Sequence, residues 1–241
     1  MLSKILISVA ALLILAGLLG LKMKTVGKRL LFVCIAAAGT VMLSVAEMNT
    51  YGLVGGCFQG IYRILAIVPG ILLFHSICKR NQVTDLEGLN GIGRRMPYTY
   101  VLLVFLCMVM TGIPVTGTFT GMIYSEIGLL AGGYGIFTYV GLVGNVLGIV
   151  VPVMLLFPML RRMYFPEKEK DSDADTEKGM EDAETVQENV DHVEEAVVTT
   201  PSPAKSLLTI SWLLAAVLFM FSLYQQPVLV VISTVMQKFF S

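Results

Sequence analysis

Histidine and cysteine are both rare in this sequence of 241 residues, which has two histidines and four cysteines. No cluster with metal-ligand spacing can be built from His75 and His192. The four cysteines stand singly in apolar segments, which argues against a disulfide framework or a metal site; they are Cys34, Cys57, Cys78 and Cys107. Nothing resembles a phosphate-binding loop or a nucleophile elbow. Soluble enzyme chemistry is therefore unsupported, and we expect neither a cofactor nor a nucleic-acid partner.

Charged residues are also few, and they are unevenly distributed. Only 14% of the residues are charged, whereas 56% are hydrophobic and the mean hydropathy is +0.78. A chain this apolar cannot be one soluble domain, so the sequence predicts a polytopic membrane protein. Of the 17 acidic residues, 13 lie in the segment 167–195. The remainder of the chain, with 14 basic and 4 acidic residues, is strongly basic.

The apolar runs predict an all-α fold with about six transmembrane helices. Each run can cross a bilayer at a rise of ~1.5 Å per residue. The expected spans are residues 5–21, 30–48, 53–77, 98–130, 134–160 and 207–224. Lys22 and Lys24 follow the first run without a cleavage pattern, so this run is interpreted as a retained helix and not as a signal peptide. We expect a membrane helix bundle over residues 1–165, an acidic disordered linker over 166–205, and a C-terminal transmembrane helix and tail over 206–241.

The fourth apolar run contains a pattern typical of a broken helix. Gly112 and Gly117 flank Pro114, and proline removes a hydrogen bond from the helical ladder. Discontinuous helices of this kind build ion sites in transporters, because they free backbone groups at the depth of the membrane. Pro69 and the pair Pro152 and Pro158 are interpreted as kinks in otherwise continuous helices.

Basic residues follow the first, third and fifth expected spans. The positive-inside rule places these loops in the cytoplasm, and both chain ends then lie outside. This arrangement requires that residues 98–130 cross the membrane once, as a broken helix. We therefore expect a protein integral to the cytoplasmic membrane, of a bacterium by our interpretation, with the acidic linker on the cytoplasmic side.

Four ionisable residues within or near the apolar runs are candidates for an ion path. Arg63 lies near the middle of its span, where a charge costs roughly 2.5–3.5 kcal/mol, so it should face protein or water. An arginine stays protonated, which favours an electrostatic role over proton transfer. Glu126 either exchanges protons in a desolvated site or extends to the outer interface. Glu47 and His75 lie close to helix ends, where an interfacial position is favoured.

Several segments, taken in order, resemble the antiporter-like membrane subunits of complex I (NADH:quinone oxidoreductase), of membrane-bound hydrogenases and of Mrp-type sodium/proton antiporters. The similar segments are Lys28-Arg29-Leu30-Leu31 at a helix start, Asp85-Leu86 with Gly88-Leu89 and Arg94-Arg95-Met96-Pro97 before the broken helix, Gly112-Ile113-Pro114 at the break, Gly144 to Phe165 in the following helix, and Leu223 to Leu229 near the end. The resemblance covers nearly the whole chain apart from the acidic linker. It also adds Lys28 to the ion-path candidates.

The sequence departs from the family pattern at the residues expected to relay protons. Family members have about twice as many helices, and this chain resembles their C-terminal half only. Where the family places two histidines and a lysine at four-residue spacing, this sequence has Gln59, Arg63 and Ile67. Met122 stands where family members carry a charge after the break, and Glu126 lies one turn further on.

The resemblance implies a subunit that takes part in proton or sodium translocation, coupled to redox chemistry or antiport. Its implied partners are other membrane subunits, the lipid bilayer and the transported H⁺ or Na⁺. On this hypothesis, Glu126 and the break at Pro114 belong to a half-channel, and Arg63 sets its electrostatics. One alternative is a non-conducting scaffold subunit of such a complex, favoured by the replaced relay residues. The other is a standalone homodimeric transporter.

Overall fold

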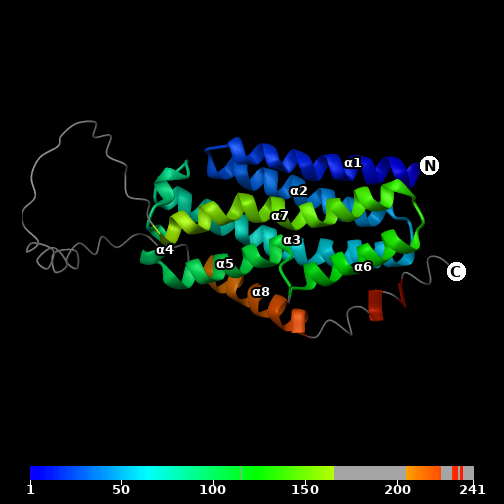
Figure 1. Cartoon of the computed structure of the whole chain (residues 1–241). Coiled ribbons are helices and arrows are strands. Elements are labelled where there is room, and N and C mark those ends of the chain that lie inside the picture. The colour runs from blue at the N-terminus through cyan, green and yellow to red at the C-terminus, as the bar shows by residue number, and fades with distance from the viewer. Residues whose placement is uncertain (115, 166–204, 224–229, 233, 236–241) are drawn as a thin grey trace, which may run out of the picture.

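A computed structural model describes residues 1–114, 116–165, 205–223, 230–232 and 234–235, and these residues form a bundle of long helices (Figure 1). The first two helices are α1 (Leu2–Ala16), extended by the 3₁₀ segment η1 (Gly17–Lys22), and α2 (Val26–Ala46). The third, α3 (Thr50–Arg80), is the longest at 31 residues and continues through Pro69. Within the described ranges no β-strand occurs, and one isolated bridge pairs Thr25 with Asp85.

The second half of the bundle begins with two short elements, η2 (Glu87–Leu89) and α4 (Ile92–Arg95). The helices α5 (Pro97–Thr111) and α6 (Gly117–Ala131) follow, then α7 (Ile136–Tyr164) and α8 (Lys205–Leu223). Figure 1 shows α5 and α6 running in succession from one end of the bundle to the other. The break between them lies between Thr111 and Gly117, so the predicted interruption of this helix is confirmed. Its single crossing of the membrane stays a prediction.

Five helices are long and apolar enough to cross a membrane by length and composition: α1 with η1, α2, α3, α7 and α8. A sixth candidate span is the pair of Glu87–Arg95 and Pro97–Thr111, which is bent by 114°. The all-α polytopic fold is confirmed. The predicted spans agree with these helices within a few residues, and the largest shifts are at the start of α2, which begins at Val26, and at the end of α7, which extends to Tyr164. The predicted linker 166–205 lies almost wholly outside the described residues, and so does most of the tail after α8.

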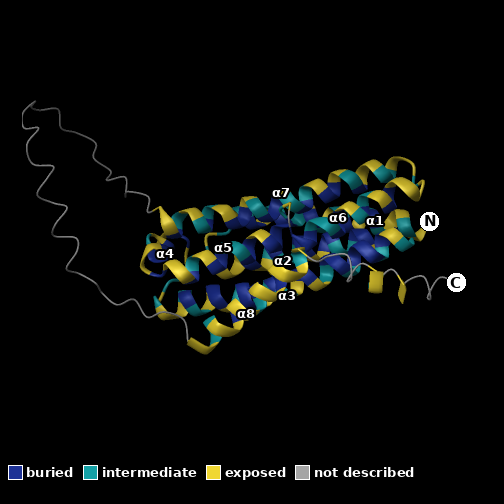
Figure 2. Cartoon of the chain, turned by 90° about the horizontal axis from the view of Figure 1, so that it is seen from below, coloured by how far each residue is buried: buried dark blue, intermediate teal, exposed yellow. Residues whose placement is uncertain are grey.

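Packing places α3 at the centre of the bundle. It contacts α2, α5, α6 and α8, and its contact with α6 is the most extensive between any two elements. Buried residues line the inward sides of the helices, whereas many exposed positions are large and apolar (Figure 2). In water such a surface would be costly, whereas in a bilayer it is the expected lipid-facing surface.

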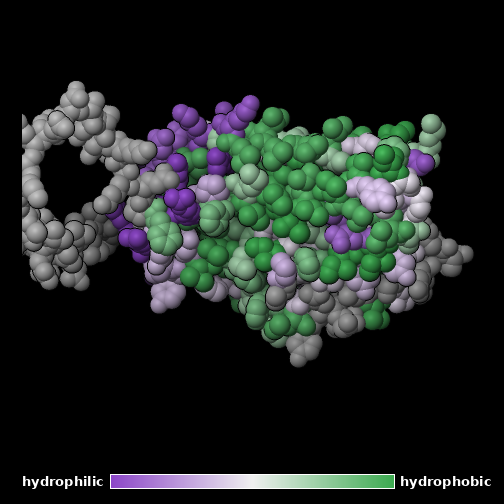
Figure 3. Space-filling view, viewed as in Figure 1, coloured by the Kyte–Doolittle hydropathy of each residue, from purple (hydrophilic) through white to green (hydrophobic). Residues whose placement is uncertain are grey.

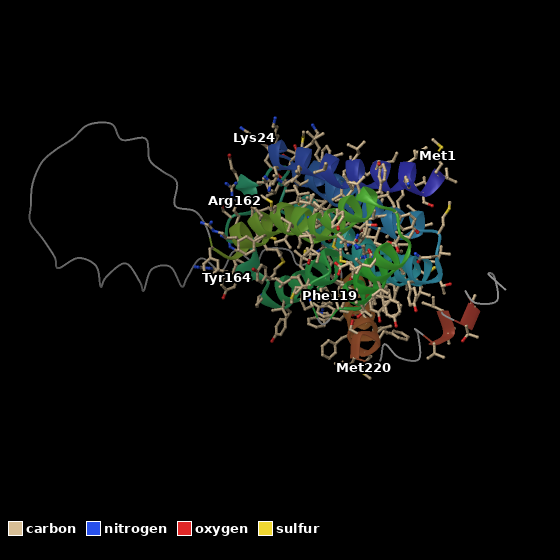
Figure 4. All side chains as sticks on the ribbon, turned by 45° about the vertical axis from the view of Figure 1, so that its right-hand side comes forward. Met1, Lys24, Phe119, Arg162, Tyr164 and Met220 are labelled. Atoms are coloured by element: carbon tan, nitrogen blue, oxygen red, sulfur yellow. The ribbon has the colours of Figure 1, made fainter. Side chains whose placement is uncertain are left out.

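The two ends of the bundle differ in polarity. Hydrophilic residues gather at the end that carries the loops after α1, α3 and α7, and apolar residues cover most of the middle (Figure 3). Lys24, Arg162 and Tyr164 all lie at this end, opposite Met1 (Figure 4). We call it the basic end, and the opposite one the outer end.

Candidate functional site

A chain of buried polar side chains lies between α2, α3, α6 and α7. We call it the polar axis, and its members are Thr40, Ser44, Glu47, Gln59, Arg63, Ser125 and Asn145, all of them buried. Thr40, Ser44 and Glu47 follow one another at spacings of four and three residues along α2 and its C-cap. This spacing puts them on one face of the helix. The Ser44 hydroxyl donates to the Thr40 carbonyl over 3.1 Å, and Thr40 Oγ1 donates to the Ala37 carbonyl over 2.8 Å. These bonds keep the hydroxyls inside an otherwise apolar interface.

Glu47 ends the polar axis near the outer end and is only 1% exposed. Its Oε1 accepts a hydrogen bond from Ser125 Oγ on α6 at 2.5 Å. Asn145 on α7 donates from Nδ2 to the same Ser125 oxygen at 3.3 Å. The second carboxyl oxygen, Oε2, has no hydrogen-bond partner among the described residues. Glu47 is thus a buried, incompletely satisfied carboxyl group at a junction of three helices.

Arg63 lies at the other end of the polar axis, in the middle of α3, and is also 1% exposed. Its Nη1 donates to the Ala37 carbonyl at 3.0 Å, while Nε and Nη2 find no partner in the described part of the chain. One turn away on α3, Gln59 donates to Ser44 Oγ at 2.9 Å. Ala37 and Glu47 are ten residues apart on α2, or ~15 Å. The two buried charges therefore belong to one polar chain without forming an ion pair.

Glycines provide the space that the polar axis occupies. A Cβ added to Gly128 would collide with Glu47 Oε2, and one added to Gly148 would collide with Thr40. At Gly121 it would come within 2.7 Å of Gln59 Cγ. Close helix packing around small residues is typical of membrane interiors. Here it also leaves room for polar side chains.

The outer end of the polar axis is covered by the turns on either side of it. The Tyr134 hydroxyl, between α6 and α7, donates to the Glu47 backbone carbonyl. Asn49 caps α3 by accepting from the Gly52 amide at 2.7 Å and donates to the Gly128 carbonyl at 2.8 Å. Burial raises the pKa of the Tyr134 phenol, and Glu47 raises it further against the opposing hydrogen bond from Asn49. The phenol therefore stays protonated and remains a donor at neutral pH.

The helix break lies beside α3. Gly112 ends α5 with a left-handed φ of 77°, and the Ile113 amide turns back to the Met108 carbonyl at 3.3 Å. Thr118 Oγ1, in the first turn of α6, donates to the Val109 carbonyl at 2.9 Å, and the Gly112 amide donates to the same carbonyl at 3.3 Å. Gly117 lets the Tyr62 ring pack directly against the start of α6. The predicted break residues thus adopt the interrupted backbone that the sequence indicates.

The predicted site residues do not all come together. Only Arg63 and Glu47 belong to the polar axis, and the expected interfacial position of Glu47 was wrong, because Ser125, Asn145 and the turn at Tyr134 enclose it. Glu126 is the next residue after Ser125, but it is only half-buried and makes no hydrogen bond to the axis. His75 is exposed near the end of α3, and its interfacial position stays a prediction.

Lys28 is exposed at the start of α2, whereas the neighbouring side chain of Arg29 is buried. Arg29 donates to the Met23 carbonyl at 2.9 Å and to the Leu21 carbonyl at 3.1 Å. The guanidinium group thereby ties η1 to α2. Arg29 therefore has a structural role, whereas the side chain of Lys28 is exposed.

Sequence reasoning missed Ser125, Asn145 and the hydroxyls of α2. The spacing of Thr40, Ser44 and Glu47 was a usable signal, since it places three polar residues on one side of a transmembrane helix. Asn145 lies singly in an apolar run, and nothing local distinguishes it from a satisfied core amide. In the described part of the chain, no group of three histidine, cysteine, aspartate or glutamate residues could hold a metal ion.

A family model described as NADH:quinone oxidoreductase/Mrp antiporter, TM, matches residues 1–149. The chain is 30% identical over 98 residues to NADH-quinone oxidoreductase subunit N 2 of Solidesulfovibrio magneticus. This match covers 40% of this chain and 21% of that protein. It is 28% identical over 170 residues to the subunit of the same name from Chloroherpeton thalassium, covering 69% of this chain and 32% of the relative. The matches thus span about a third or less of these relatives' length.

Solved structures share the fold over almost the whole chain. A chain of the Mrp complex from Dietzia sp. matches with a TM-score of 0.72 at 19% identity, over 97% of this chain and 46% of that one. A chain of respiratory complex I from Thermus thermophilus gives a TM-score of 0.71 at 15% identity, over 98% of this chain and 44% of that one. A chain of an archaeal membrane-bound sulfane sulfur reductase gives a TM-score of 0.72 at 18% identity, over 98% of this chain and 42% of that one. At these identities the likeness shows the fold.

Proposed function

Because the chain belongs to the NADH:quinone oxidoreductase/Mrp antiporter family of transmembrane proteins, we propose that it is an antiporter-like subunit taking part in proton or sodium translocation. The translocation is coupled to redox chemistry or antiport elsewhere in a larger membrane complex. Other membrane subunits of that complex are its partners. It resides in the cytoplasmic membrane with the basic end inside, as the positive-inside rule requires.

The observation that carries this proposal is the buried carboxyl group of Glu47 in the polar axis. A lone hydroxyl is too few partners to fix a carboxylate permanently in a low-dielectric interior. A carboxyl group held in this way can bind and release H⁺, or exchange H⁺ for Na⁺. A path for ion translocation requires such a group. Ionisable residues inside membrane spans commonly mark such paths.

Arg63 complements this role without transferring protons itself. Its guanidinium group stays protonated, so it supplies a constant positive charge ~15 Å along the axis from Glu47. That charge disfavours a second cation in the axis. His75 and Lys28 lie toward the basic end, where the path would meet the cytoplasm.

The test is coupled ion flux in inverted native membrane vesicles that contain the assembled complex. We expect Glu47→Gln to reduce flux at least about tenfold, because the amide keeps the shape and cannot ionise. Glu47→Asp should retain part of the flux. Glu87→Gln, a matched change at an exposed carboxyl group of the basic end, should have no effect. Unchanged flux with Glu47→Gln in a fully assembled complex would contradict the role of Glu47.

Glu126→Gln belongs in the same series. We expect a smaller reduction than for Glu47→Gln, because the Glu126 side chain is half-buried and outside the hydrogen-bonded axis. A large loss with Glu126→Gln alone would instead place the path along α6, as the sequence-based hypothesis has it.

A non-conducting scaffold is the second candidate function. It is favoured by the apolar residues Ile67 and Met122 and by the fixed charge of Arg63, since none of these relays a proton. For a scaffold, removal of the chain prevents assembly, while substitution of Glu47, Glu126 or Arg63 leaves flux unchanged. Purification of the tagged chain in mild detergent, with mass spectrometry of the co-purifying proteins, distinguishes both functions from a standalone transporter.

A further inference from the structure

A cavity of about 620 Å³ lies between α2 and α3 at the basic end, away from the polar axis. Its walls are mainly apolar and include Leu31 and Cys34 of α2 and Ile71 of α3. His75 and Lys79, four residues apart on one side of α3, line its end nearest the loops. The cavity thus has a cationic mouth and an apolar interior.

Backbone hydrogen bonds between two loops border the cavity at the basic end. The Val26 amide donates to the Thr84 carbonyl at 3.1 Å, and the Leu86 amide donates to the Lys24 carbonyl at 3.1 Å. The Val83 amide donates to the Cys78 carbonyl, near the end of α3, at 2.9 Å. These bonds hold the loop 81–86 against the start of α2, so the cavity is a defined part of the fold.

The dimensions of the cavity match one leaflet of a bilayer. From Ile71 to Lys79 the cavity wall follows α3 over a rise of ~12 Å. One leaflet contributes about half of a hydrocarbon core that is about 30 Å thick. A molecule in this cavity would therefore have its head at the level of the basic loops and its tail in the apolar region of the same leaflet.

We propose that this cavity binds an anionic phospholipid. The phosphate lies at Lys79 and His75, and an acyl chain lies along Leu31, Cys34 and Ile71. Basic pockets between transmembrane helices on the cytoplasmic side are suited to anionic headgroups, and each cation near the surface adds to the binding. The proposal does not depend on the role of Glu47 or Arg63, because no residue of the polar axis lines the cavity.

Gly27 offers a way to fill the cavity without disturbing the protein. It lines the cavity, and a Cβ built on it meets no atom within 4 Å. Gly27→Phe therefore adds a large side chain in open space where the lipid would lie. Lys79→Gln removes the cation and leaves the cavity open. Arg95→Gln, an equal charge change at an exposed position of the same end, and Leu12→Phe, at an exposed site on α1, are the matched controls.

The experiment is native mass spectrometry of the purified, delipidated complex, titrated with phosphatidylglycerol or with phosphatidylcholine of the same acyl chains. We expect a preference for phosphatidylglycerol that Lys79→Gln reduces about fivefold, as expected for one interfacial cation. Gly27→Phe should abolish the preferred binding, whereas both control variants should bind as the unmodified protein does. Thermal unfolding of each variant shows that it is folded.

Three results would overturn the proposal. Equal binding of the two lipids would mean that the cavity takes a neutral amphiphile. Equal losses with Lys79→Gln and Arg95→Gln would assign the preference to the general charge of the basic end. Unchanged phosphatidylglycerol binding by Gly27→Phe would place the lipid elsewhere.

Discussion

At the scale of single residues, the chain buries two opposite charges without pairing them. Arg63 has one carbonyl partner and Glu47 has one hydroxyl partner, and ~15 Å of helix separates the two. Burying a charge this way reduces stability unless hydrogen bonds satisfy it. Arg29, also buried, shows the contrast, because it donates to three carbonyls. A buried charge with few partners is better explained by function than by stability.

This contrast predicts opposite effects of the same substitution at two arginines. Arg63→Met should raise the free energy of unfolding of the purified complex by about 1–3 kcal/mol, because an incompletely paired charge leaves the membrane interior. Ion flux should fall at the same time, since the axis loses its fixed charge. Arg29→Met, the control, should lower stability, because three carbonyls lose a donor. The measurement is thermal unfolding in detergent, and a lower melting temperature for Arg63→Met would show that Arg63 is a structural residue.

At the scale of elements, the break between α5 and α6 depends on backbone conformation more than on proline. Gly112 takes a φ of 77°, which L-residues with a Cβ rarely adopt, whereas Pro114 is exposed in the following turn. The interrupted backbone then finds its partners locally, through Ile113 and Thr118. The break therefore satisfies most of its own hydrogen bonds inside the bundle, as membrane depth demands.

Gly112→Ala should destabilise the break by about 1–2 kcal/mol, the cost of a Cβ in the left-handed region. The added methyl group would also lie only 3.1 Å from Met122 Sδ and 3.2 Å from Thr118 Cγ2. Gly27→Ala is the matched control, because its helical backbone is ordinary and its surroundings are open. Thermal unfolding of the two variants measures the difference. If both melt alike, the left-handed conformation at residue 112 is not required.

At the scale of the whole molecule, the distribution of charge sets the orientation in the membrane. The loops after α1, α3 and α7 bring their lysines and arginines to one end, and Met1 lies at the other (Figures 3 and 4). A membrane protein retains such loops in the cytoplasm. This orientation requires that α5 and α6 together cross the membrane once.

Cysteine labelling checks this orientation. In a background without the four native cysteines, Lys24→Cys should react with a membrane-impermeant maleimide only in inverted vesicles. Ala131→Cys, exposed near the turn between α6 and α7, should react only in right-side-out cells or vesicles. Labelling of both positions from the same side would require a different path for α5 and α6.

The sequence by itself determined the fold class and the position of the break. These properties depend on the length of apolar runs and on local backbone preferences, which can be read along the chain. The family resemblance likewise depends on short motifs in order. The predicted importance of Arg63 also needed no structure, since a charge in the middle of an apolar run must be accommodated by the protein.

Only the tertiary structure decided which polar residues act together. Glu47 is adjacent to a helix end in the sequence, and that position predicts an interface. It is buried because Ser125 of α6 and Asn145 of α7 approach it across the bundle, at glycines that let the helices come close. Glu126, one residue beyond Ser125, points away from the same site because successive residues on a helix differ by about 100°. Such a choice between neighbours depends on helix rotation and packing, which no local pattern encodes.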